Sequence, residues 1–350
     1  MESQKNIKWI NAMRALCIIG VYLVHCQYVN EASWSEINKY IYPFYVNGFF
    51  FVSGYLLFWK QLSHPKIDED RKSYISKNGG GKILLGNIFF RIVLPSIIFS
   101  IIEFFPSALI QGHNISVEYG LYKTIGGGTY WFTSALAVAE LVLLIAFCSR
   151  VSKIWFYVIF TFVTALIARM CFEINIGHEI WAWNRGLMSL AILSLGGLYW
   201  KYEKHIDRLL KWWIIAPLIV LFYFIANGFL GNSDPIISIR TIQPLGFMSS
   251  AISCLLIVKL CKWLPHIKIL SFVGKNSLGY YFMSGALPIV CGIALRKILD
   301  IYVIWIILIC FLISLLFAGV IILFINGYLP WLWDIRKIKR KELDFILNKK

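Results

Sequence analysis

Ten apolar stretches, most of them long enough to cross a lipid bilayer, dominate this sequence. A transmembrane helix needs about 20 predominantly apolar residues. Only 15% of the residues are charged, against roughly 25% in soluble domains. We therefore expect an all-α integral membrane protein of about ten transmembrane helices. The stretches cover residues 8–29, 41–59, 83–105, 130–149, 154–172, 186–200, 212–230, 242–260, 271–294 and 302–328.

The positions of Lys and Arg predict how these helices are oriented, because cytoplasmic loops of membrane proteins carry an excess of positive charge. With a cytoplasmic N-terminus, 24 of the 34 Lys and Arg residues fall in inner segments and six in outer ones. We expect both termini to be cytoplasmic, with residues 1–333 forming a polytopic membrane domain and residues 334–350 a basic cytoplasmic tail that contacts membrane lipid. This topology accounts for the formal charge of +16 without a nucleic-acid partner.

The first apolar stretch contains two ionisable residues, Arg14 and His25. An ionisable side chain in a membrane span is costly enough to indicate function. Eleven residues at about 100° each place the two on one face of a helix, about 16 Å apart along its axis. A histidine can take a proton from a hydroxyl near neutral pH, and an arginine binds phosphates bidentately. Together they favour group transfer from an inner donor to an outer acceptor.

Five segments, in order along the chain, carry a resemblance to a known family. The first is MRALCIIGVYLVHC, in which ten residues separate Arg14 from His25. The others are FFFVSGYLL (residues 49–57), RIVLP (91–95), YWFTSAL (130–136) and VGKNSLGYYF (273–282). Taken together, these segments resemble the membrane acyltransferase type 3 family, whose members O-acylate bacterial surface glycans.

The resemblance implies a multi-pass O-acyltransferase of the bacterial inner membrane. It would move an acyl group, most simply acetyl, from cytoplasmic acyl-coenzyme A to a hydroxyl of an envelope or extracellular polysaccharide, or of its lipid-linked precursor. No permanently bound cofactor is implied. His25 would be the general base, and Arg14 would bind the donor or organise the site. The other implied site residues are Arg91, Lys275, Asn276 and Ser277 for the donor, and Trp131 for a wall of the substrate site.

Each of these residues also has a structural interpretation, which the sequence leaves open. Arg91 would be an anchor at a helix start, Trp131 an interfacial aromatic residue, and residues 275–277 a helix cap. The rival function is a transporter or flippase for a polysaccharide or a lipid-linked sugar, in which Arg14 binds a phosphate without covalent chemistry. The sequence does not decide whether the protein forms a homo-oligomer.

His25 has no clear carboxylate partner in the sequence. Glu140, in the fourth stretch, is the nearest acid to the position where some relatives carry one. Glu103, near the end of the third stretch, is expected to face lipid headgroups. The cysteines show no CxxC or Cys/His spacing, so we expect no metal site.

Overall fold

The computed structural model describes residues 2–29, 35–62, 80–111, 116–149, 151, 153–171, 180–229, 244–299 and 302–337, and these residues contain helices and turns but no strand. The helices are α1 (Glu2–Val29), α2 (Ser35–Tyr45), α3 (Asn47–Leu62), α5 (Gly80–Ile88), the π-helical turn η1 (Phe89–Val93), α6 (Leu94–Gln111), α7 (Val117–Thr124), α8 (Trp131–Cys148), α9 (Ile154–Cys171), the short turn η2 (Ile180–Ala182), α10 (Trp183–Leu209), α11 (Trp212–Phe229), α12 (Pro244–Trp263), α13 (Lys268–Lys275), α14 (Ser277–Met283), α15 (Ala286–Ile298), α16 (Val303–Tyr328), and the C-terminal turns η4 (Pro330–Leu332) and η5 (Ile335–Lys337).

Six helices within these ranges are long and apolar enough to cross a membrane, or up to eight spans if each of two bent helix pairs counts as one. The predicted all-α, multi-pass membrane character is therefore confirmed. Every one of the ten apolar stretches contains a helix, but α10 and α11 are bent by 108° and α14 and α15 by 48°. The number ten and the cytoplasmic termini stay predictions, and residues 338–350 of the predicted tail lie outside the described residues.

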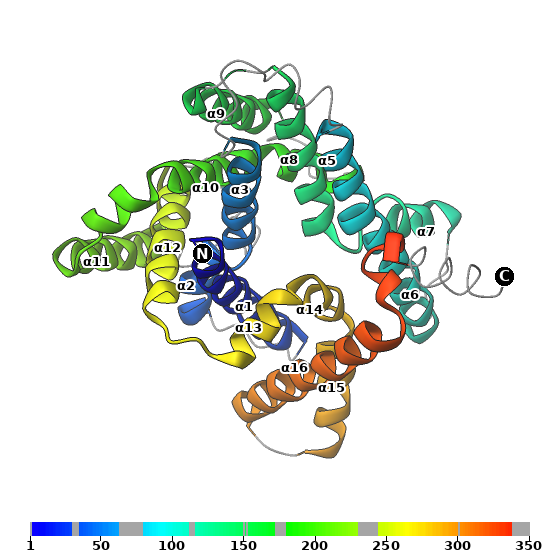
Figure 1. Cartoon of the computed structure of the whole chain (residues 1–350). Helices are drawn as coiled ribbons and strands as arrows, with labels where there is room; N and C mark the ends of the chain where they lie inside the picture. Colours follow the sequence, from blue (N-terminus) through cyan, green and yellow to red (C-terminus); the bar gives the residue numbers. More distant parts are fainter. Residues whose placement is uncertain are drawn as a thin grey trace.

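The first helix, α1, lies near the middle of the helix bundle (Figure 1). It contacts α2, α3 and α12 on one side and α13 to α16 on the other. Its side chains Met13, Cys17 and Ile18 are fully buried. A helix that is enclosed in this way must satisfy its polar side chains inside the bundle, because lipid offers no hydrogen bonds.

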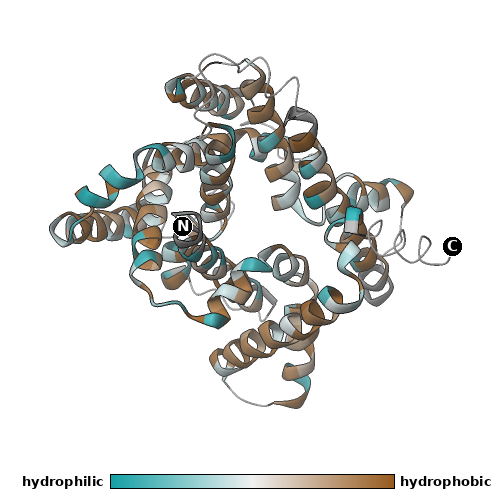
Figure 2. Ribbon diagram, in the orientation of Figure 1, coloured by the Kyte–Doolittle hydropathy of each residue, from teal (hydrophilic) through white to brown (hydrophobic). Residues whose placement is uncertain are grey.

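The outer helices consist largely of apolar residues (Figure 2), and many of their apolar side chains are exposed. On α16, Leu312, Leu316 and Val320 are more than half exposed, whereas Ser314 and Ala318 are fully buried. The exposed residues recur every four positions and so share one face of the helix. In water this apolar face would be a liability, but facing lipid it is the expected surface of a transmembrane helix.

Gly54, in the FFFVSGYLL segment, allows α3 to pack directly against the backbone of α10. A Cβ atom at Gly54 would overlap the carbonyl oxygen of Leu193. The contact is reciprocal, since a Cβ at Gly196 of α10 would overlap the carbonyl oxygen of Phe51. Small residues of this kind let membrane helices approach closely, so the motif glycine has a structural explanation.

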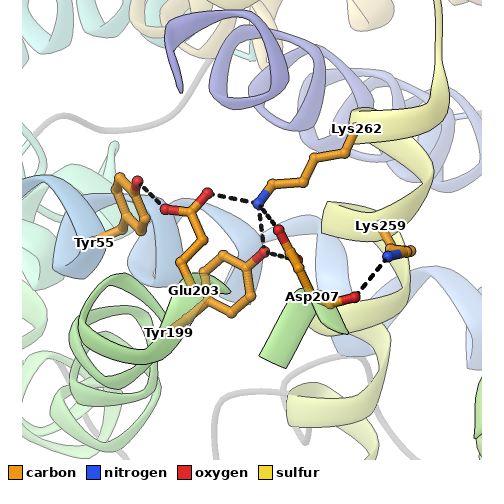
Figure 3. Close-up of polar contacts among 6 residues, drawn as sticks. All are labelled: Tyr55, Tyr199, Glu203, Asp207, Lys259 and Lys262. Atoms are coloured by element: carbon orange, nitrogen blue, oxygen red, sulfur yellow. Dashed lines mark hydrogen bonds and ion pairs between the residues drawn. The ribbon is translucent and has the colours of Figure 1, made fainter. Parts of the chain in front are cut away.

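An ion-pair cluster joins α3, α10 and α12 (Figure 3). Lys262 of α12 donates to Glu203 and to Asp207 of α10, each at 2.6 Å, and to the hydroxyl of Tyr199 at 2.8 Å. Tyr55 of α3 donates to the other oxygen of Glu203 at 2.6 Å. The ammonium group is thus shared between two carboxylates in a partly buried setting, where a charge needs its partners.

We expect Lys262→Met to destabilise the protein by about 2–3 kcal/mol, less than the 3–5 kcal/mol of a fully buried pair because the cluster retains some solvent access. The substitution leaves Glu203 and Asp207 facing each other without a cation. Lys259→Met, on the same helix, is the matched control, since Lys259 donates only to the backbone oxygen of Asp207 among its described hydrogen bonds, at 3.2 Å. Thermal unfolding in detergent measures both; equal losses would contradict the assignment.

Candidate active site

Arg14 and His25 lie on one uninterrupted helix, α1, which runs from Glu2 to Val29. No break or kink separates them, so the predicted shared face and the axial spacing of about 16 Å hold. Both side chains are half-buried. The two ends of α1 have different neighbours. We call the end near His25 the histidine end. We call the other end the basic end, because Gly274 packs there against Asn11 of α1 and the next residue, Lys275, lines a cavity together with Arg91.

The backbone of Ser284 holds the His25 ring. Nδ1 of His25 lies 2.7 Å from the carbonyl oxygen of Ser284, which sits at the bend between α14 and α15. A carbonyl oxygen can only accept a hydrogen bond, so Nδ1 carries the proton. In the neutral imidazole, Nε2 then holds the lone pair that can accept a proton. The backbone carbonyl thus orients the ring as a carboxylate would.

Glu103, which the sequence predicts to face lipid headgroups, is partly buried beside the same bend. The hydroxyl of Tyr130 donates to the Glu103 carboxylate and also lies 2.9 Å from the carbonyl oxygen of Phe282. A Cβ atom at Gly285 would lie 2.9 Å from Glu103 Oε1, so that carboxylate oxygen is close to the residue after Ser284. The sequence indicated Glu103 only as an acidic residue in an otherwise apolar stretch. It did not predict that Tyr130 would be its hydrogen-bond partner.

Glu140, in α8, lies within electrostatic range of two cations. The first is Lys60, which has the larger effect, and the second is Arg14. Arg14 therefore has an acidic neighbour from α8 at mid-helix. The candidate carboxylate named from the sequence thus has Lys60 and Arg14 as its electrostatic partners.

A cavity of about 290 Å³ lies at the basic end. It brings together three of the four residues predicted to bind the donor: Arg91, Lys275 and Asn276. Ser277 begins α14 immediately after them but does not line the cavity. The other lining residues are Leu278, Gly279, Asn326, Trp333 and Asp334.

Side-chain hydrogen bonds connect the wall of this basic cavity. The indole nitrogen of Trp333 donates to Asn326 Oδ1 at 2.8 Å, and Asn326 Nδ2 donates to Asn276 Oδ1 at 3.1 Å. Arg91 Nε donates to Asp334 Oδ2 at 3.3 Å. Asn326 was missed in the sequence because it lies inside the last apolar stretch, and Trp333 and Asp334 were missed because they follow that stretch and return to the bundle through a turn.

Pro95 explains the local structure around Arg91. A proline cannot donate a hydrogen bond to the carbonyl four residues earlier, and its ring clashes with that group. The carbonyl concerned is that of Arg91, and the chain forms a π-helical turn over Phe89–Val93, closed by the Leu94 N–H donating to the Phe89 oxygen. Such turns often occur at functional sites. The R-x-x-x-P motif thus sets Arg91 at a widened turn, with a side chain 58% exposed.

Asp334 is held by Arg336, whose Nε and Nη2 each lie 2.8 Å from one of its carboxylate oxygens. This bidentate contact, with the bond from Arg91, keeps the pKa of the Asp334 carboxyl below its ordinary value. A depressed pKa contributes stability above the unfolded-state value, about 3.9, and the contribution is lost as pH falls through the folded-state value.

We therefore expect acid to destabilise the wild-type protein more than Asp334→Asn, which has no charge to lose. The measurement is the thermal unfolding midpoint of each protein in detergent between about pH 6 and about pH 3. Parallel curves for the two proteins over this range would contradict the assignment.

Trp131 lies at the start of α8, where the guanidinium of Arg185 stacks 5.0 Å from its ring centre.

A column of aromatic rings connects the two ends of the site. Phe99 stacks on Trp333 at 5.2 Å and on Phe282 at 4.7 Å, and Phe282 meets Tyr130 edge-on at 4.9 Å. The column links the wall of the basic cavity to the Tyr130–Glu103 pair.

Comparison with known proteins identifies one family. A family model described as an acyltransferase domain matches residues 7–325, nearly the whole chain. Curated proteins and solved structures gave no match. The matched range includes all five sequence segments, whereas Asn326, Trp333 and Asp334 of the basic cavity lie beyond its end.

Proposed function

The chain belongs to the membrane acyltransferase type 3 family, and we propose that it transfers an acyl group, most simply acetyl, from cytoplasmic acyl-coenzyme A to a hydroxyl of a cell-envelope or extracellular polysaccharide. The observation that carries this proposal is the pairing, across one bundle, of a basic cavity with an oriented histidine at the opposite end of α1. The bacterial inner membrane is the proposed location.

The basic cavity suits the phosphates of the donor. Arg91 and Lys275 provide cations, and Asn276 provides a polar amide beside them. About 290 Å³ is at the lower limit of small-molecule pockets, so it accommodates the phosphate-bearing end of a coenzyme and not the whole molecule. The excess of Lys and Arg in the predicted inner segments supports a cytoplasmic position for this end.

His25 acts as the general base in the proposed reaction. Nε2 takes the proton of the acceptor hydroxyl, and the sugar oxygen attacks the thioester carbonyl carbon. The carbon–sulfur bond then breaks, and the leaving thiolate takes the proton back from the imidazolium. Arg14, between the two ends and near Glu140, organises the path of the donor's acyl arm.

The rival function, a flippase for a lipid-linked sugar, requires no base. An orienting bond to His25 Nδ1 that leaves Nε2 available is what proton transfer needs, and the family is one of acyltransferases. Both observations favour covalent transfer.

The test uses the protein purified in detergent, so that both faces are accessible. It is incubated with acetyl- or succinyl-coenzyme A and the polysaccharide of a strain lacking the gene. We expect mass spectrometry to detect one added acyl group per modified sugar. A deletion strain that retains acylated polysaccharide inside the cell but fails to export it would instead indicate a transporter.

We expect Arg91→Ala to raise the KM for the acyl donor by about 10- to 100-fold, the equivalent of a charge-assisted hydrogen bond of about 1.5–3 kcal/mol. The KM for the acceptor should not change. Arg208→Ala on α10, an exposed arginine that does not line the cavity, is the control. An unchanged donor KM would mean that Arg91 does not bind the donor and serves only as an anchor at the start of a helix.

A further inference from the structure

A second cavity, of about 710 Å³, lies between α7 and the turn η2 that precedes α10. Its walls include the rings of Tyr119 and Tyr122 from α7 and of Trp181 from η2. Ser116, the N-cap of α7, and Glu118, in its first turn, add polar groups. The volume lies within the range of about 300–1,000 Å³ that is typical of small-molecule sites.

The chemistry of this cavity differs from that of the basic cavity. No Lys or Arg is present among the described residues that line it. Lys123 is close, 5.6 Å from the ring centre of Tyr119, but is not a lining residue. A phosphate is therefore a poor occupant. A sugar ring, with C–H groups on its faces and hydroxyls at its rim, suits aromatic faces combined with carboxylate and hydroxyl groups.

The backbone at Trp181 is strained. Trp181 has φ 61° and Ala182 has φ 44°, two successive left-handed residues that are not glycine. Each such residue costs on the order of 1–3 kcal/mol and persists only where its surroundings enforce it. Here the Trp181 N–H donates to the Gly126 oxygen at 2.7 Å, and Ala182 is buried. The fold thus maintains an unfavourable backbone that sets a large ring in the cavity wall.

The cavity is at the histidine end of the site. The ring of Tyr119 contacts that of Phe104 at 6.1 Å, and Phe104 follows Glu103 in the chain. Glu103 lies against Gly285, whose neighbour Ser284 holds His25. An occupant of the cavity would therefore be on the side of the bundle where the proposed base is.

We propose that this cavity binds a sugar residue of the acceptor, with the ring of Trp181 against a C–H face and Glu118 accepting from a hydroxyl. The inference rests on the proposed acyltransferase function and adds to it the site that selects the acceptor. The sugar can be presented by a finished polysaccharide or by a lipid-linked precursor, since either carries the same ring.

Trp181→Gly tests the proposal, because glycine adopts the left-handed backbone without strain while the substitution removes the side chain that carries the ring. The purified protein is assayed with acyl-coenzyme A and, in separate arms, with the polysaccharide fraction and the lipid-linked sugar fraction of a strain lacking the gene. We expect the KM for the preferred fraction to rise about tenfold or more, as the loss of about 1.4 kcal/mol of binding would give. The arm with the lower wild-type KM identifies the source.

The KM for the acyl donor should stay unchanged in Trp181→Gly, and Glu118→Gln should raise the acceptor KM in the same direction. Trp212→Ala, which removes an exposed ring from α11, is the control for loss of a tryptophan. An acceptor KM at the wild-type value, or a donor KM that rises equally, would overturn the acceptor site. A wild-type protein that acylates neither fraction would instead overturn the proposed function, which is a separate result.

Discussion

His25→Ala is expected to reduce the rate of acyl transfer by about 10²- to 10⁴-fold, the contribution of a positioned general base. In the proposed mechanism Nε2 accepts the proton, because Nδ1 is committed to the Ser284 carbonyl at 2.7 Å. The donor KM should change little, since the basic cavity is at the other end of α1. The measurement is kcat with each substrate varied in turn.

His25→Asn separates basicity from hydrogen bonding. The asparagine amide can donate to the Ser284 oxygen from nearly the position of Nδ1, but it cannot take up a proton near neutral pH. We expect it to be as inactive as His25→Ala while matching the wild type in thermal stability. Substantial activity in His25→Asn would mean that the ring has a structural role and that the base lies elsewhere.

Gly274→Ala is expected to impair donor use severely. A Cβ atom at Gly274 would overlap the carbonyl oxygen of Asn11 in α1, so α13 must move away from α1. Lys275 and Asn276 follow directly and line the basic cavity. A displacement on the order of 1 Å can cost about 100-fold in rate. We expect kcat/KM for the donor to fall by about that factor.

Gly228→Ala is the matched control, because a Cβ atom at Gly228 of α11 meets nothing within 4 Å. It should retain wild-type activity and be at least as stable, since alanine favours the helix over glycine. If Gly274→Ala retains the wild-type donor kinetics, the close contact between α1 and α13 does not position the basic cavity. Size-exclusion chromatography would distinguish a displaced helix from a protein that fails to fold.

The pattern of apolar residues was sufficient to predict the helices, because long uninterrupted stretches admit little else in a bilayer. The bends were not predicted. At the α14–α15 bend, Pro288 lies four residues after Ser284 and has no N–H to donate to the Ser284 carbonyl, a signal that the sequence interpretation did not use. The 108° turn between α10 and α11 falls at Leu210-Lys211, which the sequence showed only as a gap between two apolar stretches.

The site was predictable where it depends on one helix or one motif. Helical periodicity relates Arg14 to His25 without any tertiary information. The meeting of Arg91 with Lys275 followed only from the family resemblance, because 184 positions separate them in the chain. Pro288 leaves the Ser284 carbonyl without its usual helical donor, but the sequence does not show which side chain reaches that carbonyl, so the orienting partner of His25 was sought among carboxylates.

The close approach of α3 to α10 through Gly54 and Gly196 has a mechanical consequence. Helices slide past one another when a layer of side chains between them can repack, and backbone in direct contact with backbone offers no such layer. The two helices should therefore behave as one rigid body during the reaction cycle. Movement that admits and releases substrates would then occur at hinges between other elements. The bend at Ser284 is one such position, and because Ser284 holds His25, a hinge there would move the proposed base.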